Sequence, residues 1–269
     1  MAELPEIYLI SQQMQVELVD KTISGIEILQ PKCLNIPPED FSIALSGAQI
    51  KNVSYRGKWV FVNTTRGWLL LCLGMGGEIL LVDRTRMPEK RRVIFDLANS
   101  SCLVVNFWWF GYTHFTAQLV DHKMTSGLGP NAIDLDTTGL RSLFMNRRGA
   151  LKSFLLDQDR IAGIGNFYVH DILFKAHLHP MRTIQTLTEN EVDGLSTAIH
   201  DRLELAIQKG GFAYEQDLFG QKGHFGMDDL LIGYKENQPC PVCGTVIVKI
   251  KTGSTSSFIC SQCQPFVSS

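Results

Sequence analysis

The stretch Leu155-Leu-Asp-Gln-Asp-Arg-Ile-Ala-Gly-Ile-Gly-Asn166 joins two segments of helical periodicity, Leu151–Asp157 and Gly165–Ala176. Its glycines let a ligand or another backbone approach closely, and Asn166 lies where the second helix opens. Because the first N–H groups of a helix have no partner inside the helix, such a turn predicts a phosphate-binding site. A plain helical hairpin with an asparagine N-cap is the alternative for a lone Gly-x-Gly-Asn, so the flanking sequence has to decide.

Helical periodicity continues on both sides of this turn. Thr138–Asn146 precedes it, Glu189–Lys209 follows it, and Gly210-Gly211 ends the last long helix. Basic residues lie just upstream of the turn, at Arg147-Arg148 and at Lys152. These cations would extend the phosphate site into a small basic patch.

The chain before Gly127-Leu-Gly-Pro130 follows a different pattern, and this stretch marks the predicted boundary between two halves. A helix is predicted first, over Leu4–Asp20, with Pro5 in its first turn, where a missing N–H costs nothing. Short strand-like runs follow, separated by turn signals such as Arg56-Gly57. This pattern favours a β-sandwich or barrel. The seven runs are Thr22–Leu29, Ala48–Tyr55, Trp59–Thr64, Trp68–Leu73, Glu78–Val82, Arg92–Asp96 and Cys102–Phe107.

Two Cys-x-x-Cys pairs near the end of the sequence flank 16 residues with the pattern of a β-hairpin. One strand is predicted over Val246–Lys251 and the other over Ser256–Ile259, with Gly253 at the turn. Four thiolates held by two such corners give a tetrahedral Zn²⁺ site with no open position, and therefore a structural ion. The predicted ligands of this single zinc ion are Cys240, Cys243, Cys260 and Cys263.

Composition and charge limit the class of protein. The 269 residues are 45% hydrophobic and 19% charged, which suits an ordinary folded protein. A formal net charge of −2 and a pI of about 6.4 argue against a strong nonspecific DNA binder, so DNA affinity must come from a local patch and be salt-sensitive. Neither a membrane span nor a secretory signal is predicted. Cys33, Cys72 and Cys102 are expected to be buried free thiols, as in a bacterial cytoplasm with its nucleoid or a eukaryotic nucleus.

Taken in order along the chain, these motifs resemble the formamidopyrimidine-DNA glycosylase and endonuclease VIII family. The resemblance runs nearly end to end, with the motifs in the family's order and spacing. They are Glu3-Leu4-Pro5-Glu6, Arg56-Gly57-Lys58, Leu73-Gly74-Met75-Gly76-Gly77, Phe110-Gly111, Leu128-Gly129-Pro130, Leu156-Asp157-Gln158 with Ala162–Asn166, His179-Pro180, and the four-cysteine finger followed by Gln264.

The resemblance implies an α+β protein of three parts that binds damaged or abasic DNA as a monomer. The parts would be an N-terminal helix with a β-sandwich (residues 1–126), a helix-two-turns-helix domain (130–236) and a β-hairpin zinc finger (237–269). In the family, DNA lies in the cleft between the two halves. A loop over Glu215–Asp229 is expected to cover the base pocket and, from its glycines, to be mobile.

The resemblance also implies a chemistry for the N-terminus. In the family, removal of the initiator methionine exposes a proline nitrogen that attacks C1′ of the damaged nucleotide, and the base leaves. A Schiff base and strand scission follow. The next residue, a glutamate, handles protons, and a strand lysine assists near the phosphate. Glu3 and Lys58 match these two positions, Asn166 matches the phosphate turn, and Met75 matches a side chain that fills the gap left by the flipped base.

Five positions depart from the family pattern. Ala2 replaces the proline, and its freed α-amine, with a reference pKa of about 7.7–8.0, would remain a nucleophile. Trp108 and Trp109 replace two arginines, one of which normally reads the orphaned partner base. Ser254 or Thr255 stands in place of the arginine at the finger tip, and Cys72 in place of a common histidine. Weakened strand scission is expected, because the nucleophile is altered and a phosphate contact is lost.

Two interpretations of function stay open. One is a base-excision DNA glycosylase with weak abasic-site lyase activity, in which Ala2, Glu3 and Lys58 are catalytic and Met75, Trp108, Trp109, Phe110, Lys152 and Asn166 bind DNA. Aromatic rings at 108–110 would stack on unpaired bases and favour single-stranded, forked or distorted DNA, unless the tryptophans belong to the sheet core. The alternative is a noncatalytic binder of damaged or abasic DNA. Glu3 would then be a helix-start carboxylate and Lys58 a solvated strand lysine.

Overall fold

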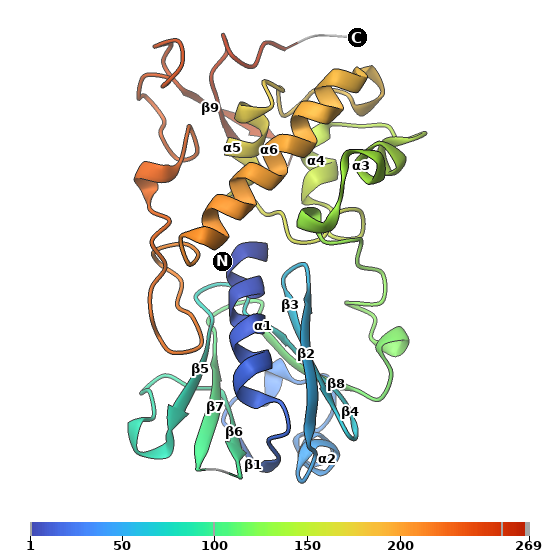
Figure 1. The fold of residues 1–269 in the computed structure, drawn as a ribbon, viewed down its shortest axis with the longest axis vertical. Helices are drawn as coiled ribbons and strands as arrows, with labels where there is room; N and C mark the ends of the chain where they lie inside the picture. Colours follow the sequence, from blue (N-terminus) through green and yellow to red (C-terminus); the bar gives the residue numbers. More distant parts are fainter. Residues whose placement is uncertain (1, 99, 254, 267–269) are drawn as a thin grey trace. The chain divides into compact units, whose positions relative to one another are not determined.

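The computed structural model describes residues 2–98, 100–253 and 255–266. Contacts divide the chain into two compact units (Figure 1). The first, called here the sandwich unit, runs to Gly127 and also includes Lys209–His224. The second, called here the helical unit, holds Leu128–Gln208 and the chain from Phe225 onward. No helix of the described residues is long and apolar enough to cross a lipid bilayer.

Helix α1 (Leu4–Leu18) opens the sandwich unit. Glu3 is its N-cap, and the backbone N–H of Glu3 donates to Oε2 of Glu6 at 2.8 Å, which satisfies one donor at the helix start. The helix ends two residues earlier than the sequence predicts, because Asp20 adopts a left-handed backbone with φ of 67°.

Two antiparallel four-stranded sheets form the predicted sandwich. In Figure 1, α1 runs along both sheets, with β5, β7, β6 and β1 on one side and β2, β3, β4 and β8 on the other. The first sheet has the order β1 (Ile23–Ile28), β6 (Val93–Leu97), β7 (Ser101–Asn106), β5 (Glu78–Asp83). The second has the order β2 (Ile50–Arg56), β3 (Trp59–Thr64), β4 (Gly67–Cys72), β8 (Tyr112–Thr116).

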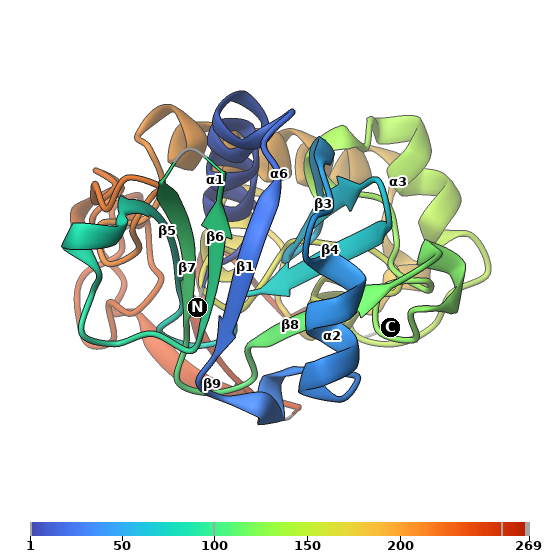
Figure 2. The same ribbon diagram turned by 90° about the horizontal axis from the view of Figure 1, so that it is seen from below.

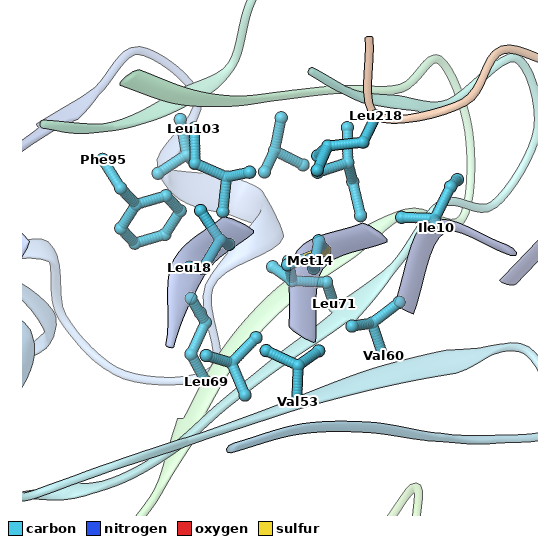
Figure 3. Packing of buried hydrophobic residues seen from close by; sticks show 14 of the residues in the cluster. Ile10, Met14, Leu18, Val53, Val60, Leu69, Leu71, Phe95, Leu103 and Leu218 are labelled. Atoms are coloured by element: carbon cyan, nitrogen blue, oxygen red, sulfur yellow. The ribbon is translucent and has the colours of Figure 1, made fainter. Parts of the chain in front are cut away.

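The core of the sandwich unit lies between these sheets and is completed by one face of α1. Ile10, Met14 and Leu18 point from the helix into the space between the sheets (Figure 3). Burying such side chains stabilises the fold by about 1.5–3 kcal/mol each. Figure 2 shows the short helix α2 (Pro38–Leu45) beside β1 and β4, where Phe41 is fully buried.

The sequence did not predict α2 or strand β8. Tyr112–Thr116 contains two threonines and a histidine, so no apolar run marks it as a strand. Thr113 and His114 are nevertheless buried, because β8 pairs with β4. The imidazole of His114 lies 2.8 Å from that of His122 inside the unit.

The segment Lys209–His224 packs with the sandwich unit, although the sequence assigned it to the helical domain. Leu218 is fully buried in the sandwich core, and its carbonyl accepts a hydrogen bond from the backbone of Leu81. The side chain of Gln13 donates to Asp217 at 2.8 Å and accepts from the N–H of Leu218 at 2.9 Å. The expectation of a mobile loop therefore needs correction for this part, since the segment is fixed to α1 by specific contacts.

The helical unit contains α3 (Thr137–Phe144), α4 (Leu151–Leu156), α5 (Val169–Lys175), α6 (Glu189–Gln208) and the finger hairpin, β9 (Val248–Thr252) and β10 (Thr255–Ile259). The carboxylate of Asp171 on α5 accepts hydrogen bonds from the N–H groups of Leu231, Ile232 and Gly233, and from Arg202 of α6. Phe174 and Phe258 share one buried cluster. By its contacts the finger lies in the same unit as the helices, whereas the sequence analysis predicts a separate domain for it.

Short 3₁₀ helices complete both units. They are η1 (Pro31–Cys33), η2 (Arg84–Arg86), η3 (Leu119–Asp121), η4 (Ala132–Asp134), η5 (Ile184–Thr186) and η6 (Met227–Asp229).

Candidate functional site

The four predicted zinc ligands converge in the helical unit. Their sulfur atoms all lie within 4.8 Å of one another, with Sγ–Sγ distances of 3.4 Å between Cys243 and Cys260, 3.6 Å between Cys243 and Cys263, and 3.8 Å between Cys240 and Cys263. A tetrahedral ion with Zn–S bonds of about 2.3 Å would require sulfur atoms about 3.8 Å apart. The cluster therefore fits one structural zinc ion and no open coordination position.

The finger hairpin is built around the amine of Lys152. Nζ donates to the carbonyl oxygen of Ser256 at 2.6 Å and to the hydroxyls of Ser257 at 2.9 Å, Thr255 at 3.0 Å and Thr252 at 3.3 Å. Lys152 is 2% exposed, and burial lowers its pKa to about 8. The expectation that Lys152 contacts a DNA phosphate needs correction, because its amine is enclosed by the hairpin and holds it in shape.

The finger tip carries no arginine. Gly253 has φ of 62°, which favours glycine at this turn. Of the two residues expected in place of the arginine, Ser254 lies outside the described residues. The hydroxyl of Thr255 contacts Lys152 and the carbonyl of Thr252, so its side chain is used within the hairpin.

The side chain of Gln158 holds the glycine-rich turn that precedes Asn166. Its Oε1 accepts from the N–H of Gly163 at 2.9 Å, and its Nε2 donates to the carbonyls of Ile164 at 2.8 Å and Leu156 at 3.1 Å. Helix α5 begins at Val169 with Tyr168 as N-cap, so Asn166 lies in the turn and does not cap the helix. Among the described residues, the buried Oδ1 of Asn166 has no hydrogen-bond partner. This oxygen is therefore unpaired but not accessible to solvent in the structure.

The chain start is enclosed in the sandwich unit. Ala2 is 4% exposed and Glu3 is 3% exposed, so Glu3 is not an ordinary surface carboxylate. Met1 precedes Ala2 in the sequence, and the Ala2 nitrogen is therefore an amide here. Glu6, which the sequence analysis did not single out, connects this start to the 209–224 segment, because its Oε1 accepts from the N–H of Phe212 at 3.0 Å.

Lys58 lies half-buried in the β2–β3 turn, next to Gly57 with φ of 57°. Burial raises the pKa of the Cys72 thiol, and the nearby charge of Lys58 opposes part of this rise. Cys72 is thus a largely neutral thiol in the position of the family histidine. Because the thiolate is the reactive form of cysteine, this thiol is expected to be unreactive.

A buried histidine pair follows along the same sheet. Nδ1 of His114 lies 2.8 Å from Nε2 of His122, and Nδ1 of His122 lies 2.8 Å from the hydroxyl of Thr125. Trp59 contacts both imidazoles and stacks on Tyr112 with ring centroids 5.8 Å apart. Burial lowers the pKa of His114 to about 4, with a smaller contribution from His122. No sequence pattern predicts this pair, because the two histidines are separated by a loop.

Four exposed side chains, Met75, Trp108, Trp109 and Phe110, form what is called here the aromatic tip. Two backbone hydrogen bonds join its two loops, from Met75 to the Trp109 carbonyl at 2.8 Å and from Trp108 to the Met75 carbonyl at 3.0 Å. The exposed fractions are 41% for Met75, 60% for Trp108, 64% for Trp109 and 69% for Phe110. The sheet-core alternative for the tryptophans is therefore wrong. Strand β7 ends at Asn106, before either ring.

The backbone of the aromatic tip is tightly constrained. Phe110 has a left-handed backbone with φ of 57°, which is uncommon for a bulky residue, and its ring is exposed. A Cβ at Gly74 would lie 2.2 Å from the Trp109 carbonyl oxygen, so only glycine fits there. Such strain is often retained where a side chain must be presented to a ligand.

The sequence-predicted site residues divide between the two units. Ala2, Glu3, Lys58 and the aromatic tip belong to the sandwich unit, whereas Asn166, Lys152 and the zinc ligands belong to the helical unit. A buried glutamate at the start of the first helix, a turn held by a glutamine and a four-cysteine hairpin finger are features that the family resemblance implies.

The chain belongs to the formamidopyrimidine-DNA glycosylase family. Residues 1–107 match the N-terminal domain of formamidopyrimidine-DNA glycosylase, residues 126–216 match its H2TH domain, and residues 237–265 match the zinc finger found in this enzyme and in isoleucyl-tRNA synthetase. The family recognition, the fold class and the structural zinc predicted from the sequence are confirmed.

Relatives and solved structures match over the full length. The formamidopyrimidine-DNA glycosylase of Chloroflexus aurantiacus is 32% identical, with 98% of each chain covered. That of an Escherichia coli strain is 31% identical over 98% of this chain and 100% of its own. The Lactococcus lactis enzyme, solved in complexes with abasic-site DNA and with Fapy-dG DNA, is 26% identical with a TM-score of 0.88, covering 98% of this chain and 100% of its own.

Proposed function

We propose that this protein is a base-excision DNA glycosylase that removes damaged bases through the α-amine of Ala2, after cleavage of Met1. The observation that carries the proposal is the burial of Glu3 directly beside that nitrogen, at the start of α1. An amine nucleophile with an adjacent carboxylate is the acid–base arrangement that displacement of a base requires. The solved complexes of the Lactococcus lactis relative with abasic-site and Fapy-dG DNA support DNA of this class as the ligand.

The chemistry follows from this arrangement. The lone pair of the Ala2 nitrogen forms a bond to C1′, and the bond from C1′ to the base breaks. The leaving base takes up a proton, and Glu3 is placed to deliver protons at the base or the sugar oxygen and to accept them again. Loss of the amine proton and opening of the sugar ring then give a Schiff base. Lys58 supports the adjacent phosphate by its charge.

Weak strand scission is expected from two features of the chain. The secondary amine of a proline forms an iminium ion with a permanent positive charge, whereas the primary amine of Ala2 forms an imine that must be protonated before it withdraws electrons. Elimination of the 3′ phosphate is slower without that charge. The finger tip also lacks the arginine that would stabilise the departing phosphate. Thr255 does not replace it, because its hydroxyl is bound within the hairpin.

A preference for single-stranded, forked or distorted DNA is the second part of the proposal. The aromatic tip presents three exposed rings and no cation at the positions where the family reads the partner base. Stacking on an aromatic ring is worth about 1–3 kcal/mol per base and does not require a paired partner. Lys58 and Asn166 would grip the backbone, and the protein would act as a monomer.

A noncatalytic binder of damaged or abasic DNA is the second candidate. The replacement of the family's proline by Ala2 and the absence of an arginine in the described finger hairpin favour it. It predicts binding to abasic DNA without covalent chemistry, which separates it from the first candidate.

Borohydride trapping on abasic DNA tests the proposal. Mass spectrometry first establishes that Met1 is absent from the purified protein. Weak trapping through Ala2 is expected, stronger trapping with Ala2→Pro, and none when an uncleaved N-terminal tag blocks the amine. Glu3→Gln should slow base release more than Schiff-base formation on a pre-formed abasic site, because that substrate has no base to expel. Retained Met1, or no trapped species with Ala2→Pro, would establish the noncatalytic binder instead.

A further inference from the structure

A groove of about 250 Å³ lies beside the aromatic tip, entirely within the sandwich unit. Its walls include Lys32 and Cys33 of η1, Arg92 just before β6, Phe107 just after β7, and the rings of Trp108 and Trp109. The volume is below the about 300–1,000 Å³ of a pocket for a drug-sized ligand, so the groove has room for one planar ring system.

The two tryptophans are not equivalent in this groove. The ring of Trp108 is already engaged, since a Cβ at Gly76 would lie 3.2 Å from it and the amine of Lys90 lies 5.6 Å from its centroid. Within the described residues, Trp109 has no aromatic or cationic partner, although its side chain is 64% exposed. Trp109 is therefore the ring with a face available for stacking.

The charges on the groove select an anionic ligand. Nε of Arg92 donates to the Phe107 carbonyl at 2.5 Å, and its guanidinium lies 5.6 Å from the Phe107 ring centroid, which fixes the cation at the groove wall. Lys32 is exposed at the rim, and no described residue pairs with its amine. The wall contains no carboxylate. A planar base beside a phosphate satisfies both the aromatic ring and the two cations.

From these contacts we infer that the groove binds an unpaired nucleobase of the strand opposite the damaged nucleotide, stacked on Trp109 with its phosphate near Lys32 and Arg92. The inference rests on the proposed function. Met75, which would fill the gap left by the flipped nucleotide, is joined to Trp108 and Trp109 by backbone hydrogen bonds, so the groove begins beside that gap. The chain has no arginine at 108 or 109 to hold the partner base in the helix, and it offers a stacking site in its place.

A thermodynamic cycle between the ring and the base tests this inference. The probes are two duplexes with a tetrahydrofuran abasic analogue, one with adenine opposite it and one with a second tetrahydrofuran and therefore no base to stack. Fluorescence anisotropy gives each Kd. The wild-type protein should bind the adenine duplex about 5- to 150-fold more tightly. Trp109→Ala should bring this ratio close to one, and Trp109→Phe should keep most of it. Trp108→Ala should weaken both duplexes about equally.

Lys32 provides an independent measurement. Lys32→Ala should lower the salt dependence of binding to the adenine duplex by roughly one phosphate and leave the other duplex unchanged. Lys51→Ala is the matched control. Lys51 is an exposed lysine of the same unit, and its Nζ lies 3.8 Å from Oδ1 of Asp20. Equal losses of Trp109→Ala on both duplexes would overturn the inference and leave the proposed function intact. If the wild-type protein does not prefer either duplex over undamaged DNA, the proposed function fails, and this inference fails with it.

Discussion

The side-chain amine of Lys152 lies 2.6 Å from the carbonyl oxygen of Ser256, inside the finger hairpin that is more than a hundred residues further along the chain. This contact joins α4 to β10 and fixes the hairpin that lies between the two Cys-x-x-Cys pairs of the zinc site. The amine is the hydrogen-bond donor to these oxygen atoms of the hairpin. Its contribution is to the shape of the finger.

Replacement of Lys152 should therefore destabilise the helical unit. Lys152→Met leaves the Ser256 carbonyl and the neighbouring hydroxyls without their donor, at a cost of about 1–3 kcal/mol. Urea unfolding and hydrogen exchange of the Thr252–Ile259 amides measure this loss. Lys251→Met, an exposed lysine on the same hairpin, is the control and should change stability little. Equal effects of the two variants would show that the buried contacts contribute nothing specific.

The salt dependence of DNA binding should distinguish Lys58 from Lys152. Lys58→Ala should reduce the slope of log K against log salt by about 0.9, the value for one lost phosphate contact. Lys152→Met should leave the slope unchanged, because its amine is enclosed by the hairpin. Binding isotherms at several salt concentrations measure both slopes. An unchanged slope for Lys58→Ala would place the DNA backbone elsewhere.

The histidine pair should make the sandwich unit sensitive to acid. The pKa of His114 is about 4 in the folded protein, below its ordinary value of about 6.5, so the unfolded chain binds more protons between these values. Stability is fully present above pH 6.5 and falls as the pH drops towards 4. At pH 5 the loss from His114 is about 2 kcal/mol.

His114→Gln should remove this part of the acid sensitivity. Unfolding followed by tryptophan fluorescence at pH 7.5 and pH 5 provides the comparison, since Trp59 contacts both imidazoles. His122, whose pKa is also lowered by burial, keeps its own share, so the dependence should be reduced and not abolished. An equal loss of stability between pH 7.5 and pH 5 in the wild type and in His114→Gln would show that His114 does not cause the acid sensitivity.

Gln13 should control the opening of the 209–224 segment. Gln13→Ala removes the bonds to Asp217 and Leu218, and the Leu218 amide should exchange with solvent roughly 5- to 10-fold faster, as expected for a loss of about 1 kcal/mol. Gln12→Ala, its exposed neighbour on α1, should not change the exchange. Exchange measured by mass spectrometry that is identical in both variants would mean that Leu218 alone fixes the segment.

Zinc should be present at one ion per chain, as measured by elemental analysis of protein purified without chelator. Cys243→Ser should lower this content and expose the hairpin, because the binding energy of a structural zinc is part of the folding energy. Protein that contains no zinc before any chelation would disprove the metal site.

Much of this protein follows from its sequence alone. The zinc ligands are fixed by local spacing, because two Cys-x-x-Cys corners place four thiols on one hairpin. Seven of the eight sandwich strands are recognised from their runs of apolar residues, with ends that differ by at most two residues from the structure. The family motifs identified the fold, since their order along the chain is preserved.

Only the tertiary structure decided which side chains are available for function. Lys152 and Lys58 are equally basic in the sequence, but contacts far along the chain bury one and leave the other partly exposed. The His114–His122 pair and the attachment of Leu218 to α1 also depend on segments that meet only after folding. The physical reason is that local pattern reports backbone preference and periodicity, whereas burial and hydrogen-bond partners are set by residues distant in the chain.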